Sequence, residues 1–306
     1  MLRTLKITDG KLAETLPESA DVLVYIAPDE AERRHLIDQL KIDEHTLNSS
    51  LDVDELSRLE FEPDHTAMIL KRPKNYSSED NFVFKVVSTG LFLFKDRLIA
   101  VVAEDAPLFE GKPFLKIRSL PDLILKMIYR AIFHFEEHLK VINMISGSLE
   151  QQINTAMENR HLLNLFTLEK SLVYYLNAIN TNRMLIEKLK ANAARIGFTP
   201  ENLEYLDDIV IENNQCHEQA SIYSNILASL MDARASIVAN NLNVLMKTLN
   251  IIVIAIMLPT LMVSIFSMNV ALPIPQEQYL WPFWLVVALA MGSAGVVAWI
   301  WRHKRL

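Results

Sequence analysis

The sequence predicts an α/β domain at the N-terminus, a long helical stalk after it and two transmembrane helices at the C-terminus. Three observations predict this fold class. Short β-rich runs alternate with a helical stretch at first, helical periodicity then continues with few breaks, and two uncharged apolar runs lie near the end of the chain. We therefore divide the chain into a domain at 1–118, a stalk at 119–247, a first span at 248–268, an outer loop at 269–280, a second span at 281–301 and a basic tail at 302–306.

Four runs of the N-terminal domain are rich in β-branched and aromatic residues and predict strands. They read DVLVYIA at 21–27, HTAMILKR at 65–72, FVFKVVS at 82–88 and LFLFKDRLIAVVAE at 91–104, the last a hairpin around Lys95, Asp96 and Arg97. Between the first two runs, Pro28, Asp29 and Glu30 predict the start of a helix that continues to about Lys41. The order of the strands stays open.

Two helices are expected after this domain. Ser119 is a candidate N-cap, Pro121 suits a first helical turn, and helical periodicity then continues to about Met157. A second helix runs over 162–195 and ends before Gly197, a residue type that is common just after a helix.

A third helix begins at Pro200 and contains no breaker before Pro259. Its apolar residues advance by threes and fours, which is typical of a helix packed along its length. If it continues to Phe266, it is about 100 Å long at about 1.5 Å per residue. The stalk then runs directly into the first membrane span.

Two runs without charge are long enough to cross a bilayer, which takes roughly 20 apolar residues. The first is IIVIAIMLPTLMVSIF at 251–266, and the second, at 281–301, carries tryptophans near both ends, as membrane interfaces favour. The loop between them has no Lys or Arg, whereas basic residues flank the pair: Lys247, Arg302, Lys304 and Arg305. The positive-inside rule therefore predicts that both termini lie in the cytosol, beneath a lipid bilayer.

Polar residues mark one face of the first span. At helical spacing, this face carries Asn243, Met246, Leu249 or Asn250, Val253, Met257, Thr260, Ser264 and Ser267. Polar groups that face lipid are costly, so a ring of identical chains that turns this face inward, around a pore, is one interpretation. Contacts between the helices of a dimer are the other, because Ser, Thr and Asn often bridge membrane helices.

These features resemble the CorA family of divalent metal-ion transporters. The resemblance rests on NNLNVLMKTLN at 240–250, LPT at 258–260, the Met268–Asn269 pair, a short loop, a second span and a basic tail, and it is strongest from about Asp207 onward. It implies a homopentameric funnel in the cell inner membrane that passes Mg²⁺, or Co²⁺ and Ni²⁺, and that is not an enzyme. The divalent cation would be both substrate and regulator, with no organic substrate.

The resemblance also assigns roles to residues. Ser267, Met268 and Asn269 stand where the family has its Gly-Met-Asn signature, the ion filter, in which asparagine carbonyls recognise the hydrated ion. The positions that line or gate the family's pore correspond to Asn243, Met246, Leu249, Met257 and Thr260. Lys247, Arg302, Lys304 and Arg305 would form a basic collar at the cytoplasmic mouth. Asp208 stands at a regulatory metal site of the family.

Several alternatives stay open. Ser267 replaces the signature glycine, which leaves the presentation of Asn269 and the identity of the ion open. A Zn²⁺ transporter of the same superfamily and a non-conducting, membrane-anchored metal sensor are the rival functions. A remote alternative is a zinc peptidase, because residues 134–138 match HxxEH, in which two histidines share one helix face.

Overall fold

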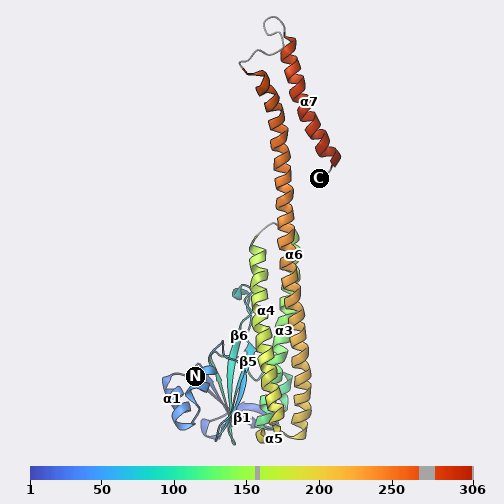
Figure 1. Cartoon of the computed structure of the whole chain (residues 1–306). Coiled ribbons are helices and arrows are strands. Elements are labelled where there is room, and N and C mark those ends of the chain that lie inside the picture. The colour runs from blue at the N-terminus through green and yellow to red at the C-terminus, as the bar shows by residue number, and fades with distance from the viewer. Residues whose placement is uncertain (156–158, 269–279, 305–306) are drawn as a thin grey trace. The chain divides into compact units, whose positions relative to one another are not determined.

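The computed structural model describes residues 1–155, 159–268 and 280–304 of the chain (Figure 1). It divides into two units, Met1–Met231 and Asp232–Leu306, and each is described by itself. The first unit combines a β-sheet with helices, and the second contains helices alone. One long helix belongs to both.

A seven-stranded mixed sheet forms the centre of the first unit, in the order β2-β1-β3-β7-β6-β5-β4. Only β3 and β7 pair in parallel among these strands, and the other neighbours are antiparallel. The strands are β1 (Leu2–Thr8), β2 (Lys11–Glu14), β3 (Val22–Ile26), β4 (Arg58–Phe61), β5 (Thr66–Pro73), β6 (Val86–Leu93) and β7 (Leu98–Val102).

Seven α-helices are described. They are α1 (Glu30–Arg34), α2 (Glu44–Ser49), α3 (Leu120–Thr155), α4 (Asn159–Ala191), α5 (Ala193–Ile196), α6 (Pro200–Phe266) and α7 (Trp281–Lys304). A π-helical turn, His35–Gln39, follows α1, and short 3₁₀ turns lie at Pro17–Ser19, Ser78–Asp80 and Lys112–Leu115. Asp29 caps α1 by accepting a hydrogen bond from the Glu32 N–H, which satisfies one of the free donors of the first turn.

The sheet is covered by helices on both faces. Along β3, Val22, Val24 and Ile26 join the larger hydrophobic core with α3, α4 and the first part of α6. Leu23 and Tyr25, on the other face, join a smaller core with the segment around α1 and α2. Because alternate residues of a strand point to opposite faces, a fully apolar strand is expected where both faces are covered. The first unit is therefore an α/β domain extended by three long helices.

The expected strands at 21–27 and 65–72 are confirmed by β3 and β5, and the expected hairpin is confirmed by the pairing of β6 with β7. The strand expected at 82–88 is wrong at its start, because β6 begins only at Val86. Asn81 and Phe82 have positive φ angles of 47° and 67°, so the backbone turns there before it extends. Strands β1, β2 and β4 were not expected; β1 and β4 have mixed polar and apolar residues.

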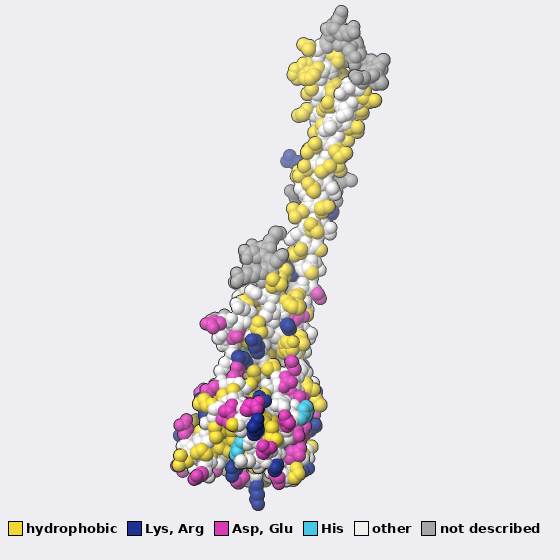
Figure 2. Space-filling view, turned by 90° about the vertical axis from the view of Figure 1, so that its left-hand side faces the viewer, with side chains coloured by type: hydrophobic (Ala, Val, Ile, Leu, Met, Phe, Trp, Pro, Cys, Tyr) yellow, Lys and Arg dark blue, Asp and Glu magenta, His cyan; other side chains and the backbone are white. Residues whose placement is uncertain are grey.

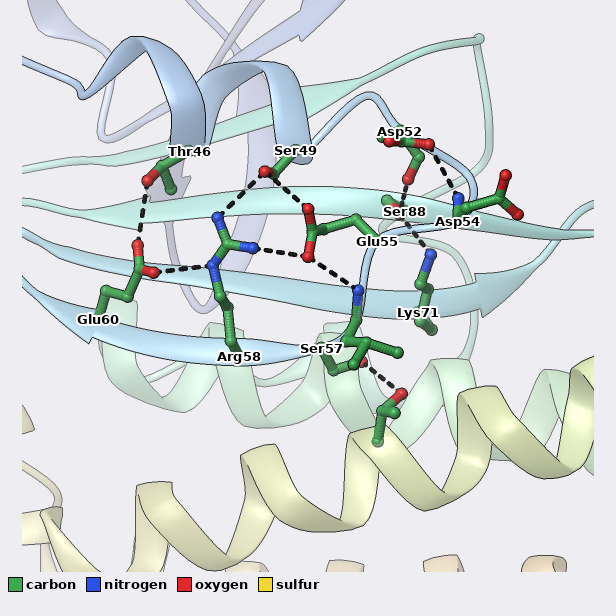
Figure 3. A network of polar contacts seen from close by, with 12 residues as sticks. Thr46, Ser49, Asp52, Asp54, Glu55, Ser57, Arg58, Glu60, Lys71 and Ser88 are labelled. Carbon is green, nitrogen blue, oxygen red and sulfur yellow. Dashed lines mark hydrogen bonds and ion pairs between the residues drawn. The ribbon is translucent and has the colours of Figure 1, made fainter.

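A polar network joins α2 to β4 and β5 (Figure 3). The Arg58 guanidinium forms ion pairs with Glu55 and Glu60, each at 2.8 Å. Nearby, the buried Lys71 Nζ donates to the Val53 carbonyl at 2.5 Å and to Ser88 Oγ at 2.8 Å. Burial lowers the pKa of Lys71. These contacts fix the segment between α2 and β4 against the sheet.

The second unit contains the last part of α6, from Asp232, and α7. On the face drawn in Figure 2, hydrophobic side chains predominate over this unit, whereas acidic and basic side chains gather over the first unit. The exposed side chains of α6 here are mostly aliphatic, such as Ile252, Ile254 and Leu261. An apolar surface of this extent requires lipid or protein contacts.

Candidate ion pathway

Two helices, α6 and α7, contain segments long and apolar enough to cross a membrane. None of the apolar window of either helix is buried inside the chain. A core helix of a soluble protein would be mostly buried, so this exposure favours two membrane spans over a soluble core. Trp281 and Trp284 lie at one end of α7, and Trp299 and Trp301 at the other, as expected for the two interfaces of a bilayer.

Each helix of the second unit has one half-buried stripe. On α6 it includes Ile251, Ala255, Leu258, Met262 and Phe266, and on α7 it includes Val286, Ala290, Ser293, Ala294 and Val297. Both stripes advance by threes and fours, so each occupies a single face of its helix. We infer that these faces pack against each other in a helical hairpin.

The candidate pore residues lie on the opposite face of α6. Thr260 follows Ile251 by nine residues, which is about two and a half turns, so their side chains point in opposite directions. Leu249 stands in the same relation to Leu258, and Met257 to Phe266. Leu249 is 54% and Met257 63% exposed, and Asn243, Met246 and Thr260 are exposed as well. The structure thus brings the predicted pore residues onto one uncovered face.

Pro259 interrupts the backbone hydrogen bonding inside the first span without ending α6. Proline has no N–H to donate to the carbonyl four residues before it. The next residue, Thr260, donates from Oγ1 to the Ile256 carbonyl at 2.7 Å. The hydrogen of a threonine hydroxyl that is bonded in this way is satisfied even in an apolar surrounding, and the oxygen stays free to accept.

The helix α6 ends beside the Ser-Met-Asn stretch. The Ser267 N–H donates to the Val263 carbonyl at 3.1 Å and the Ser264 carbonyl at 3.2 Å, which closes the last turn. The φ angle of Ser267 is not positive. The non-glycine residues with positive φ angles in the described part of the chain are all found in the first unit. A serine therefore fits this helix end without backbone strain. The filter candidate Asn269 lies outside the described residues, as do the loop at 269–279 and Arg305.

The predicted basic collar is described only in part. Lys247 and Arg302 are exposed, and the side chain of Lys304 lies outside the described ones. The Trp299 ring stacks on His303, with centroids 5.3 Å apart. These cations belong to the ends of the two membrane helices, where a basic group reaches the lipid headgroups or water.

Asp208 lies on the exposed side of α6, in the first unit. Its neighbour Asp207 is paired with Lys190 at 2.6 Å, whereas Asp208 has no ion pair within the part of the chain that the structure describes. Burial is the main cause that raises the pKa of Tyr129, and the negative charges of Glu212, Glu136 and Asp208 raise it further. These three acids therefore lie in the neighbourhood of Tyr129. The described residues nevertheless contain no group of three or more metal-binding side chains. A metal site with three protein ligands at Asp208 would need ligands from outside the described residues.

The HxxEH segment is engaged in packing and hydrogen bonding. His138 Nδ1 shares a hydrogen bond with the Tyr175 hydroxyl at 2.7 Å, and Glu137 bonds to Arg130 at 2.9 Å. Burial lowers the pKa of His138 to about 4 and that of His134 to about 3. The glutamate that would act as the base of a peptidase is therefore held by an arginine, and the segment does not have the arrangement of a zinc peptidase.

Comparisons with known proteins show the family of the chain. The model of the family of CorA-like Mg²⁺ transporter proteins matches residues 23–303. The cobalt/magnesium transport protein CorA of Methanocaldococcus jannaschii is 24% identical over 290 residues, which cover 90% of this chain and 88% of that protein.

Solved structures show the same fold. The complete structure of the CorA magnesium transporter from M. jannaschii superposes with a TM-score of 0.80 at 21% identity and covers 98% of this chain and 96% of its own. The structure of the full-length CmaX protein superposes with a TM-score of 0.72 at 16% identity. It covers 100% of this chain and 97% of its own. The cytoplasmic domain of ZntB from Vibrio parahaemolyticus superposes with a TM-score of 0.59 at 13% identity. It covers 78% of this chain and 98% of its own.

The fold and the two apolar helices define a membrane protein of the divalent-cation transporter class. The chain belongs to the family of CorA-like Mg²⁺ transporter proteins, since the family model covers nearly its whole length.

Proposed function

We propose that the chain forms a homopentameric channel that passes hydrated Mg²⁺ across the cell inner membrane. One observation carries the proposal: α6 presents Thr260 and a series of apolar side chains on the face opposite the half-buried stripe, and Asn243 is exposed on the same helix. A single hairpin would expose these polar groups to lipid, at a cost that a ring of identical helices removes. The central axis of that ring is the ion pathway.

Asn269 would be the outer filter, with Met268 and Ser267 supporting it. Mg²⁺ gives up its water reluctantly, so neutral amide oxygens suit recognition of the hydrated ion through its water shell. A ring of carboxylates would attract the ion more strongly and release it more slowly. Because α6 ends at Phe266 and Asn269 follows it by only three residues in the sequence, we expect Asn269 at the outer mouth.

Met246, Leu249 and Met257 would form hydrophobic constrictions. A narrow apolar ring empties of water and stops a hydrated ion, whereas a small widening wets it. These side chains lie between Asn243 and Thr260 along the helix, so an ion would meet a polar ring on each side of the apolar rings. The membrane potential, worth about 2.3 kcal/mol per charge per 100 mV, would drive cations inward.

Cytosolic Mg²⁺ would regulate the channel at Asp208. A single chain has no metal-binding group there within its described residues, so the site would form only where the stalk of one subunit meets its neighbour. Metal bound between subunits holds them together and favours the closed ring; its loss releases them.

Flux into liposomes tests the function directly. Wild-type protein should carry Mg²⁺, and Asn269→Ala should abolish or strongly reduce this flux. Gln276→Ala is a matched control, because it removes an amide from the same outer loop. The native mass in detergent should be five times that of one chain. A protein that carries no divalent cation, or a stable dimer, would overturn the proposal.

Zinc transport is the second candidate, because Ser267 replaces the signature glycine and leaves the identity of the ion open. Zinc sites favour histidine and thiolate ligands. The proposed pathway contains neither type, and Cys216 is buried in the first unit. Parallel measurement of Mg²⁺, Co²⁺, Ni²⁺ and Zn²⁺ fluxes separates the two candidates.

A further inference from the structure

A small cavity of about 40 Å³ lies between the sheet and α3 in the first unit. Its polar lining comes from β5, β6, α3 and the segment after β5, and consists of Arg72, Asn75, Thr89, Arg130 and His134. The remaining lining is apolar and includes Leu70 and Met127. The space is larger than the roughly 10–15 Å³ that one water molecule needs by this measure.

Arg72 is the unusual group of this cavity. Its side chain follows Met68 and Leu70 on the core-facing side of β5, and the residue is only 8% exposed. Nε donates to Thr89 Oγ1 at 3.0 Å, and Nη1 reaches the Pro73 carbonyl at 3.4 Å. Nη2 is buried without a hydrogen-bond partner in the described residues. A buried donor of a charged group is seldom left unpaired, because its desolvation is costly.

No carboxylate neutralises Arg72 within the described part of the chain. Glu104, whose charge acts on Arg72, is paired with Lys74 at 2.5 Å. Arg130 adds a second positive charge at the cavity, and its Nη1 donates a hydrogen bond to the Glu137 carboxylate. A buried positive charge without a counter-charge favours an anion that fills the role of the missing partner.

The remaining polar groups are also suited to an anion. His134 makes no hydrogen bond to any residue of the described ranges, and burial keeps its ring neutral by lowering its pKa to about 3. A neutral imidazole still offers one N–H donor, and the Asn75 amide offers two more. With the two guanidinium groups, the cavity is lined mainly by donors.

We propose that this cavity binds a small inorganic anion of the size of a halide or phosphate, held by Arg72 and Arg130. The site goes beyond the proposed channel function, because it lies in the first unit and its occupancy needs no ion flux. The anion neutralises Arg72, fills the space between β5 and α3, and so stabilises the contact between the sheet and the helices.

Anion-dependent unfolding tests the site. The full-length protein in detergent is exchanged into sodium gluconate at constant ionic strength, and the midpoint of thermal unfolding is followed by circular dichroism while bromide or inorganic phosphate replaces gluconate. We expect a saturable rise in the wild-type midpoint with at least one of the two anions. Arg72→Met should weaken the apparent affinity at least about tenfold, since a charged hydrogen bond contributes about 1.5–3 kcal/mol. Arg97→Met, at a partly exposed arginine paired with Asp96, should leave the rise unchanged.

Two results would overturn the site: no saturable effect of either anion, or an equal effect in wild type and Arg72→Met, which would be a general salt effect. If Arg72→Met fails to fold, Arg130→Met at the edge of the cavity takes its place. Crystals of the wild-type protein soaked in bromide give a test without any variant. An anomalous peak within hydrogen-bond distance of Arg72 is expected, and an ordered water alone in the cavity would refute the proposal.

Discussion

Asn182 on α4 forms two hydrogen bonds with the backbone of Lys71 on β5. The Lys71 N–H donates to Asn182 Oδ1 at 3.0 Å, and Asn182 Nδ2 donates to the Lys71 carbonyl at 2.8 Å. Arg58, the first residue of β4, pairs with Ile69 of β5, so β4 does not extend far enough to pair with Lys71. The asparagine amide thus continues the edge of the sheet where the neighbouring strand stops.

Replacement of Asn182 by Ala should destabilise the first unit by about 2–4 kcal/mol, because it leaves a buried N–H and a buried carbonyl unpaired, at about 1–3 kcal/mol each. The measurement is the midpoint of thermal unfolding of the full-length protein by circular dichroism. Asn177→Ala is the matched control on the exposed side of α4 and should change stability by less than about 0.5 kcal/mol. Equal effects of the two changes would contradict this role of Asn182.

The buried histidine pair predicts a loss of stability in acid. The pKa of His138 is about 4 in the folded protein, below its ordinary value of 6.5, because burial disfavours the charged ring. The unfolded chain therefore binds a proton below about pH 6.5 that the folded chain does not, so stability is present above that pH and falls as the pH decreases toward 4. Between pH 7 and pH 5, His138 should contribute a loss of about 1–2 kcal/mol.

His138→Gln should reduce this dependence on pH. The readout is the unfolding midpoint at pH 7 and pH 5, combined with hydrogen exchange of peptides from α3 and α4. Circular dichroism and exchange are needed because all four tryptophans lie in α7, so tryptophan fluorescence reports the second unit. His217→Gln, at a partly exposed histidine, should keep the wild-type slope; an unchanged slope in His138→Gln would contradict the assignment.

The long elements could be predicted from the sequence because their periodicity extends over many residues. The strong apolar runs also predicted β3 and β5. The weak strands β1 and β4 could not be predicted, because their mixed residues take strand conformation only when the neighbouring strand supplies hydrogen bonds and a packing surface. Strand order likewise depends on contacts between residues far apart in the chain, such as Val22 with Leu98.

The candidate site could likewise be predicted only in part from the sequence. Helical spacing predicted that Asn243, Met257 and Thr260 share a face, and that face is uncovered in the structure. The cavity at Arg72 could not be predicted, since it needs β5, β6 and α3 to meet. One signal was present in the sequence: Met68, Leu70 and Arg72 alternate along β5, which places an arginine on an otherwise apolar, core-facing side.

A smaller side chain at the apolar constriction should raise resting flux. Leu249→Ala removes apolar surface from the ring that excludes water, and we expect Mg²⁺ leak to increase on the order of tenfold, which corresponds to about 1.4 kcal/mol. Ile254→Ala is the matched control, because Ile254 is 48% exposed and, five residues after Leu249, points about 140° away from it around the helix. A larger leak in Ile254→Ala than in Leu249→Ala would contradict the assigned pore face.

Glycine in place of Ser267 should have little effect on transport. Serine takes no positive φ at this helix end, so glycine relieves no strain and only adds backbone freedom, at a cost of about 0.5–1 kcal/mol. We expect Mg²⁺ flux to change by less than about fivefold and the order of the cations to stay the same. The check is the parallel liposome assay with four cations. A new preference among them in Ser267→Gly would mean that the serine itself sets the selectivity.

Removal of the Asp208 carboxylate should release the channel from inhibition by cytosolic Mg²⁺. In the proposed ring, the exposed Asp208 completes a metal site only together with a neighbouring subunit, so Asp208→Asn weakens the site without disturbing the fold of one chain. We expect the Mg²⁺ concentration that protects the stalk from protease to rise at least about tenfold, since a ligand with one negative charge less holds a divalent cation less tightly. Asp207→Asn is the adjacent control, because Asp207 already pairs with Lys190 within its own chain. It should keep wild-type protection, and equal loss in both variants would indicate a general effect of charge on the stalk surface instead of a metal site.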